Sequence, residues 1–293
     1  MREAHGTWAQ VEILAMSESI FRELFMKIIS SSMPRRAVLV SAMAAASLLS
    51  PGTASAAPAA EVRTYASPGE HTFTVPQGVS HIRIVALGGG AGGGGGGGNN
   101  DGPLTGGGGG GGGSSAVVSC RITVADGSKI SLTVGSGGKG GKGGSGRDGD
   151  WGGNGSDTTV SIGGVTLASA EHGWEAGGGN ASNLVKSGDG GRAGGGGGEA
   201  ASRCVGTERT ITPGNSGQGG HDGSRNDRGG GGDGGTPARW PDSCPTAGVG
   251  GGGGIGAGPA GASNPGRQVN STPGYAGNDG CVVLTYTTDA SSS

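Results

Sequence analysis

Hydrophobic and polar residues alternate in several short runs on either side of long glycine tracts. In 117–124 every second position from Val118 to Val124 is hydrophobic, and 130–134 repeats the same pattern. A period of two is typical of a β-strand that buries one face. The same reasoning predicts further strands at 71–76, 81–87, 158–162, 165–168 and 281–286.

Turn residues separate these runs. Gln77-Gly78, Asp126-Gly127 and Gly163-Gly164 each lie between two predicted strands, and Gly163-Gly164 is a good two-residue hairpin turn. Beyond residue 57 no stretch has convincing helical periodicity. About seven or eight short strands joined by such turns indicate an all-β fold, an antiparallel sandwich or jelly roll.

Residues 33–56 have the form of a secretory signal peptide. Arg35 and Arg36 supply a basic start, an apolar stretch follows, and small residues lead to Ala56 and Ala57, between which we expect cleavage. The apolar stretch is shorter than a membrane-spanning helix requires. The arginine pair also fits a twin-arginine signal, so both export routes stay open. We therefore expect a secreted protein.

The segment upstream of this leader, residues 1–32, is best explained as a misassigned start site, with translation beginning at Met33. The mature chain, 57–293, is then expected to be a single glycine-rich β-sandwich domain with a long glycine-rich insertion at about 171–280. No segment of it is long and apolar enough to cross a membrane.

Composition limits how this domain can be held together. The chain has 75 glycines in 293 residues, few large side chains, and a formal net charge of −2. Collagen needs a strict three-residue repeat and abundant proline, and both are missing. Without a basic stripe, nucleic acid is not an expected partner. A conventional hydrophobic core must be small, so other interactions have to contribute.

All four cysteines follow the predicted cleavage site. An even number in an exported chain argues for two disulfides, and three pairings are possible. Cys120 and Cys281 lie in strand-like runs, whereas Cys204 and Cys244 lie in the glycine-rich middle. We expect like to pair with like, Cys120 with Cys281 and Cys204 with Cys244. Their spacing is poor for a metal site.

The glycine tracts 88–115, 135–156 and 173–280 allow two interpretations. Low-complexity glycine is normally a flexible linker. Alternatively, glycine segments form polyglycine-II helices that pack side by side, because without β-carbons their backbones can approach closely enough to hydrogen-bond. Strands flank every tract, which favours the packed bundle. The tract 225–262 is expected to be its loosest part.

Three stretches carry a resemblance to a known family: VPQGVSHIRIVALGGGAGGGGGGG, GGGGGSSAVVSCRITVADGSKISLTVGSGGKGG and GGNGSDTTVSIGGVTLASA. They resemble the secreted glycine-rich domain family over about 62–170 and the final strand. Related domains occur in the extracellular part of anaplastic lymphoma kinase and in tip adhesins of some phages. The resemblance implies a tumour-necrosis-factor-like sandwich carrying packed polyglycine-II helices, and it brings no catalytic residues.

Two tandem nonapeptides, 143–151 and 152–160, partly match a calcium-binding repeat. Asp148, Asp150 and Asp157 are weak candidate ligands, since hard carboxylate oxygens suit calcium. However, the aliphatic position of the repeat is Asp150 in one copy and a threonine in the other. We therefore predict no metal site and no cofactor.

Other polar clusters are weaker still. GSGGKGGK at 135–142 lacks the spacing of a phosphate-binding loop. The cluster His172, Trp174 and Glu175 is the most enzyme-like, and the pair His221-Asp222 is another, but no nucleophile at a recognisable turn accompanies either. The sequons at Asn154, Asn180 and Asn270 matter only if the host glycosylates them. These patterns favour surface loops over an active site.

Three classes of function stay open. The preferred one is a non-enzymatic structural or binding protein, adhesin-like, that presents the loops 171–186 and 204–244 to an extracellular protein or glycan. An ice-binding protein is the alternative, although it needs a flat periodic face of small side chains. A secreted enzyme with an unrecognised site is the third.

Overall fold

The computed structural model describes residues 59–100, 102–259 and 270–288. They belong to one compact unit, Ala56–Ser293. The leader 33–56, its cleavage position at Ala56 and Ala57, and residues 1–32 lie outside the described residues. Across the described ranges there is no helix, and therefore none that could span a membrane. The strands are β1 Ala60–Tyr65, β2 Gly69–Thr74, β3 His81–Leu87, β4 Val117–Thr123, β5 Lys129–Val134, β6 Thr158–Ile162, β7 Val165–Ala170, β8 Arg203–Cys204, β9 Thr207–Thr212 and β10 Cys281–Thr287.

These strands form two five-stranded antiparallel sheets, ordered β1-β10-β3-β4-β9 and β2-β5-β6-β7-β8. We call them the first and second sheet. Their facing sides enclose the main hydrophobic core, which includes Ile82, Ile84, Ile130, Leu132 and Leu284. The all-β prediction is confirmed: strand alternation in β5, from Lys129 to Val134, reads exposed and buried at successive positions, as the sequence indicated.

The predicted hairpin turn also forms. Gly163 and Gly164 join β6 to β7 with φ of 57° and 81°, a backbone region that favours glycine at both positions. Seven predicted strands correspond to β2, β3, β4, β5, β6, β7 and β10. The alternation did not predict β1, β8 or β9.

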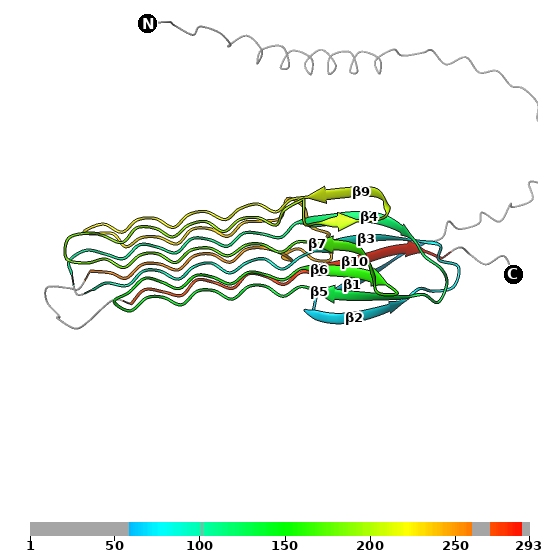
Figure 1. The fold of residues 1–293 in the computed structure, drawn as a ribbon, viewed down its shortest axis with the longest axis horizontal. Helices are drawn as coiled ribbons and strands as arrows, with labels where there is room; N and C mark the ends of the chain where they lie inside the picture. Colours follow the sequence, from blue (N-terminus) through cyan, green and yellow to red (C-terminus); the bar gives the residue numbers. More distant parts are fainter. Residues whose placement is uncertain (1–58, 101, 260–269, 289–293) are drawn as a thin grey trace, which may run out of the picture. The chain divides into compact units, whose positions relative to one another are not determined.

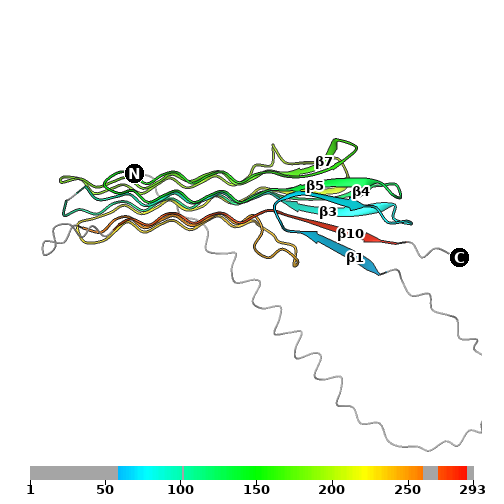
Figure 2. The same cartoon turned by 90° about the horizontal axis from the view of Figure 1, so that it is seen from below.

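The glycine tracts run as extended segments away from the sandwich and back to it (Figures 1 and 2). We number them in chain order: s1 88–98, s2 105–116, s3 135–145, s4 147–157, s5 171–182, s6 187–198, s7 213–224, s8 228–237, s9 248–258 and s10 270–280. They carry hydrogen bonds between segments instead of strand ladders. Segments s8 and s9 bond to their neighbours like the others, which contradicts the expectation of a loose tract at 225–262 for these two segments.

The first segment is surrounded on all sides. Amides of Gly94, Gly95 and Gly96 donate in turn to s2, s4 and s10 at 2.9, 2.9 and 3.0 Å, and Gly97 donates to s2 again. Carbonyls of s1 accept in the same three-residue cycle from s3, s5 and s9. From Gly89 to Gly98 every amide, and every carbonyl except that of Gly92, is thus bonded to one of six neighbours, although the segment is fully buried and has almost no side chains.

The second segment has an equivalent environment. It donates to s5, s7 and s9 and accepts from s1, s6 and s8. The remaining eight segments surround s1 and s2 in chain order, each bonded to the next, from s3 to s4 and onward to s10. Gly274 of s10 donates to Gly141 of s3 at 2.8 Å and closes the ring. Two central segments therefore lie inside a closed layer of eight.

This arrangement explains where glycine is uninterrupted. A central segment faces a neighbour at every residue, and a Cβ on Gly94 or Gly109 would lie within 3.0 Å of another segment's backbone. An outer segment turns one residue in three outward, and s3 places Ser136, Lys139 and Lys142 there. The longest glycine runs in the sequence are accordingly the two central segments.

Both cysteine pairs differ from the prediction. Cys120 bonds Cys204, linking β4 of the first sheet to β8 of the second, and Cys244 bonds Cys281. Pairing like with like is wrong because Cys120 and Cys281 lie on opposite faces of one sheet. Cys120 points into the core, whereas Cys281 aligns with Leu87 on the outer face. Two disulfides, as expected, do form.

Candidate ligand-binding face

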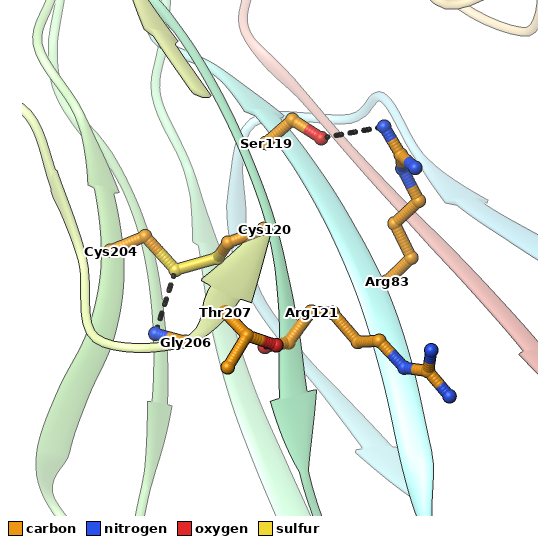
Figure 3. The surroundings of a disulfide bond; sticks show 7 residues. All are labelled: Arg83, Ser119, Cys120, Arg121, Cys204, Gly206 and Thr207. Carbon is orange, nitrogen blue, oxygen red and sulfur yellow. Dashed lines mark hydrogen bonds between the residues drawn. A yellow bond between two sulfur atoms is a disulfide. The ribbon is translucent and has the colours of Figure 1, made fainter. Parts of the chain in front are cut away.

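The outer face of the first sheet is polar and carries arginines. Antiparallel register places Arg83 of β3 directly opposite Arg121 of β4, with Thr285 of β10 on the other side of Arg83. Arg83 donates to the hydroxyl of Ser119 at 3.3 Å. Figure 3 shows both arginines on the side of β4 away from the Cys120–Cys204 bond. Like charges directly opposite each other destabilise a sheet, so stability alone does not explain this pair.

A loop covers one end of this face. Residues 238–247 are attached there by the Cys244–Cys281 disulfide, and the indole of Trp240 donates to the carbonyl of Ala247 at 2.9 Å. Together with Leu87, Val117 and Val283, the loop forms a second, smaller hydrophobic cluster on the outer side of the sheet. Trp240 is therefore held in place as a wall of the face.

A backbone irregularity positions a carboxylate at the opposite wall. The pairing of β4 with β9 shifts register between Ser119 and Arg121, and Glu208 of β9 has φ of 50°. No other non-glycine residue in the described ranges has positive φ. Bulges of this kind redirect side chains, and Glu208 lies 3.5 Å from Arg121. Strained backbone of this type is concentrated at functional sites.

Two cavities adjoin along the face, with volumes of about 400 and 310 Å³. Both include Arg83, which stands between them. The lining is rich in hydroxyls and holds three arginines against one glutamate; the charged lining residues are Arg83, Arg121, Arg239 and Glu208, with His81 beside them. The size is within the range of small-molecule sites. We call this surface the arginine groove.

Tyrosines at the edge of the sheet have a separate electrostatic network. Tyr286 donates to Glu61 at 2.9 Å, and Arg63 lies 3.4 Å from the Tyr286 oxygen, a hydrogen bond that raises the pKa of Arg63. Burial raises the pKa of Tyr65 above its usual value.

A family model described as a glycine-rich domain matches residues 65–287, which include both sheets and the bundle. The chain belongs to this glycine-rich domain family. No curated protein matches it. This match agrees with the resemblance to a glycine-rich domain family that the sequence showed.

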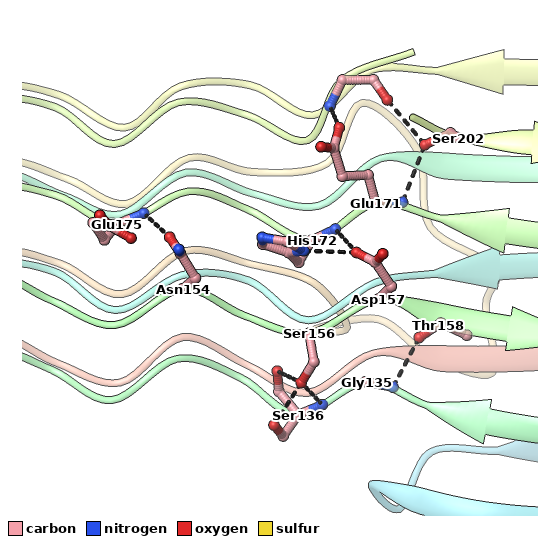
Figure 4. Close-up of polar contacts among 11 residues, drawn as sticks. Gly135, Ser136, Asn154, Ser156, Asp157, Thr158, Glu171, His172, Glu175 and Ser202 are labelled. Atoms are coloured by element: carbon pink, nitrogen blue, oxygen red, sulfur yellow. Dashed lines mark hydrogen bonds and ion pairs between the residues drawn. The ribbon is translucent and has the colours of Figure 1, made fainter. Parts of the chain in front are cut away.

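Within the glycine-rich domain, two of the calcium candidates have a structural contact. Asp157 accepts from the amide of His172 at 3.0 Å, and Asp148 accepts from the amide of Ala181 at 2.6 Å. Asn154, between them at the same three-residue spacing, accepts from Glu175 at 2.7 Å (Figure 4). Side chains of s4 thus satisfy outward amides of s5 that have no segment beside them.

The third candidate, Asp150, is 4.0 Å from Arg147 in an exposed ion pair. No group of three or more potential metal ligands occurs among the described residues. The three aspartates therefore do not converge within the described part of the chain.

The enzyme-like cluster is an element of the bundle surface. His172 contacts Asp157 through its ring nitrogen Nδ1 at 2.6 Å and lies 5.0 Å from Trp174 between ring centroids. Glu175, the third member, has its amide bonded to Asn154 and lies three residues further along s5. Within the described ranges, no hydroxyl or thiol is hydrogen-bonded to His172, so the cluster lacks a positioned nucleophile.

The remaining sequence candidates also lie on outer segments. Asp222, next to His221 on s7, accepts from the amide of Gly190 at 2.7 Å, the same type of contact that Asp157 makes. Lys139 and Lys142 of the GSGGKGGK stretch occupy outward positions of s3. The residues of the arginine groove that sequence reasoning missed include Arg83 and Arg121. Each occupies a solvent-facing position of a predicted strand, which was the available signal.

Proposed function

We propose that this glycine-rich domain is a secreted, non-enzymatic binding protein of adhesin type. In this proposal the ten segments are polyglycine-II helices and the two sheets are a jelly roll of tumour-necrosis-factor type. The three-residue cycle of hydrogen bonds supports the helical assignment, because polyglycine-II has three residues per turn and no internal bonds. The bundle would act as a rigid support, and the sandwich would present the ligand.

The observation that carries the proposal is the saturation of s1 and s2 by six neighbours each. Ordering a glycine costs about 1–2 kcal/mol of backbone entropy. A hydrogen bond returns a net of about 1 kcal/mol. Only a segment whose donors and acceptors are both used can approach balance, so this bundle fits a protein selected for stiffness.

Export supports the same function. Disulfides persist in oxidising compartments, and both bonds of this domain are compatible with an extracellular location. The leader at 33–56 and the sequence resemblance to the domains of anaplastic lymphoma kinase and phage tip adhesins point in this direction too. Its partner would be an extracellular protein or glycan.

We prefer this function to the other two classes. Ice binding needs a flat periodic array of small side chains, whereas outward positions of s3 include Lys139 and Lys142. An enzyme needs a positioned reactive group, and the best histidine, His172, is held by the carboxylate of Asp157 on the bundle surface. The arginine groove, by contrast, has the volume and the charges of a binding site.

Hydrogen exchange on the oxidised protein tests the rigid support. Amides of s1 and s2 should be as protected as those of β3 and β4, because all four elements are hydrogen-bonded to neighbours on both sides. Unprotected amides in 88–116 would instead indicate that these glycine runs are flexible linkers.

A second experiment tests the class of function. Immobilised protein is exposed to extracellular polymers, and retention without chemical change is the expected result. Chemical turnover of a polymer would favour an enzyme, and thermal hysteresis in solution would favour an ice-binding protein. Either result, obtained without retention, contradicts the proposal.

A further inference from the structure

The arginine groove combines three independent features at one place. These are two like charges placed opposite each other, a disulfide-anchored wall carrying Trp240, and a strained residue, Glu208, that holds one of the arginines. Each is costly or unnecessary for the sheet itself. Their coincidence points to a ligand that compensates for them.

We propose that the groove binds a carboxylate-bearing saccharide, a deepening that rests on the proposed binding function. The carboxylate lies between Arg83 and Arg121. Because a guanidinium offers a planar fork of N–H donors, it matches a carboxylate with two parallel hydrogen bonds. Glu208 orients Arg121 from one side, while Ser119 accepts from Arg83, so both forks are partly fixed before the ligand arrives.

The rest of the lining fits a sugar ring. Hydroxyls surround the two arginines, and they both donate and accept, as the hydroxyls of a sugar do. Trp240, Pro241 and Val85 form an apolar wall of the larger cavity, against which the C–H side of a pyranose ring packs. The two adjoining cavities, about 400 and 310 Å³, hold consecutive residues of an oligosaccharide with Arg83 between them.

An acidic peptide fits this surface less well. Extended peptides usually bind by adding a strand to a free sheet edge. The arginine groove lies on a sheet face, where the backbone groups of β3 and β4 are already bonded to neighbouring strands. Main-chain recognition is therefore blocked over β3 and β4, where the two arginines lie, and side chains alone must recognise a ligand there.

Calorimetric titration of the oxidised chain with trigalacturonate tests the proposal. We expect binding that is lost with the methyl-esterified trisaccharide, which keeps the ring and removes the charge. Arg83→Gln should weaken binding about ten- to a hundred-fold, the usual loss for hydrogen bonds to a charged group. Arg192→Gln, which removes an exposed arginine on s6, is the control for net charge and should leave affinity unchanged.

Other outcomes overturn the inference. Equal binding of the methyl ester, equal weakening by Arg192→Gln, or comparable affinity for triglutamate would each refute it, provided that Arg83→Gln keeps the thermal unfolding midpoint of the parent. A sialylated trisaccharide bound more tightly, with the same dependence on Arg83, would support the proposal and identify the sugar acid, whereas a sulfated trisaccharide bound more tightly would refute the assignment to a carboxylate. If Arg83→Gln retains extracellular polymers as well as the parent protein does, the inference about the arginine groove is refuted while the proposed binding function stands. If nothing is retained, the proposed function itself fails.

Discussion

Replacing Gly94 by alanine tests whether close backbone packing holds the bundle. Gly94 lies in the middle of s1, and a Cβ there would come within 3.0 Å of the backbone of Gly177 and Gly178 in s5. These are backbone atoms, so no rotamer change relieves the contact. The two segments would have to separate by on the order of 1 Å, which forfeits much of the dispersion energy between them.

That separation weakens the hydrogen bonds between s1 and s5. The bond from Gly179 to Gly95, now 2.9 Å, moves beyond the normal range, and the bond from Ser182 to Gly98, now 3.0 Å, is strained as well. Overpacking costs about 1–3 kcal/mol and each lost bond about 1 kcal/mol. We expect Gly94→Ala to lower the free energy of unfolding by about 2–4 kcal/mol.

Gly219→Ala is the matched control. Gly219 lies on s7, where the nearest atom to an added Cβ is the carbonyl oxygen of Gly191 at 3.6 Å, an ordinary contact. Alanine also reduces the entropy of the unfolded chain, so this variant should be neutral or more stable by up to about 1 kcal/mol. Urea unfolding of the oxidised proteins measures both. If the two variants lose equal stability, the packing argument is refuted.

Three further outcomes follow from described contacts. Replacing Cys120 and Cys204 by alanine opens a loop of 84 residues and should lower unfolding free energy by about 3–5 kcal/mol in calorimetry; no loss under oxidising conditions would contradict this. Asp157→Ala leaves the His172 amide without its acceptor, so that amide should exchange faster than in Asp157→Asn, which keeps an oxygen there. Burial raises the pKa of Tyr65, so the folded state favours the neutral phenol. The stabilisation from this phenol is complete below the pKa of tyrosine in the unfolded chain, about 10, and is lost as the pH rises through the pKa of Tyr65 in the folded state. Denaturant unfolding between pH 8 and 11 should show this loss, and Tyr65→Phe should reduce it.

The sequence predicted the strands that bury one face and missed those that do not. In β5 the alternation of Lys129 to Val134 matches its burial, whereas β1 and β9 lie at the two edges of the first sheet and are largely exposed. An edge strand such as Thr207–Thr212 has no buried row, so it gives no period of two. Its existence depends on pairing with β4, which is a tertiary interaction.

The candidate site could be predicted only in part. Arg83 and Arg121 each occupy an outward position of a predicted strand, but only strand register shows that they face each other. Register also decides the disulfides, because it places Cys120 and Cys281 on opposite faces. Contacts between s4 and s5, including that of Asp157 with His172, depend on which outer segments are neighbours.

The closed layer of eight segments around two constrains how this protein can change its length. In the polyglycine-II geometry that we propose for these segments the rise is about 3.1 Å per residue, so one three-residue turn added to every segment would lengthen the bundle by about 9 Å and keep its cross-section. An insertion in a single segment would instead protrude from the tip, since its neighbours offer no matching donors. Length variation in natural homologues should therefore come as multiples of three, shared between an outgoing segment and the one that returns.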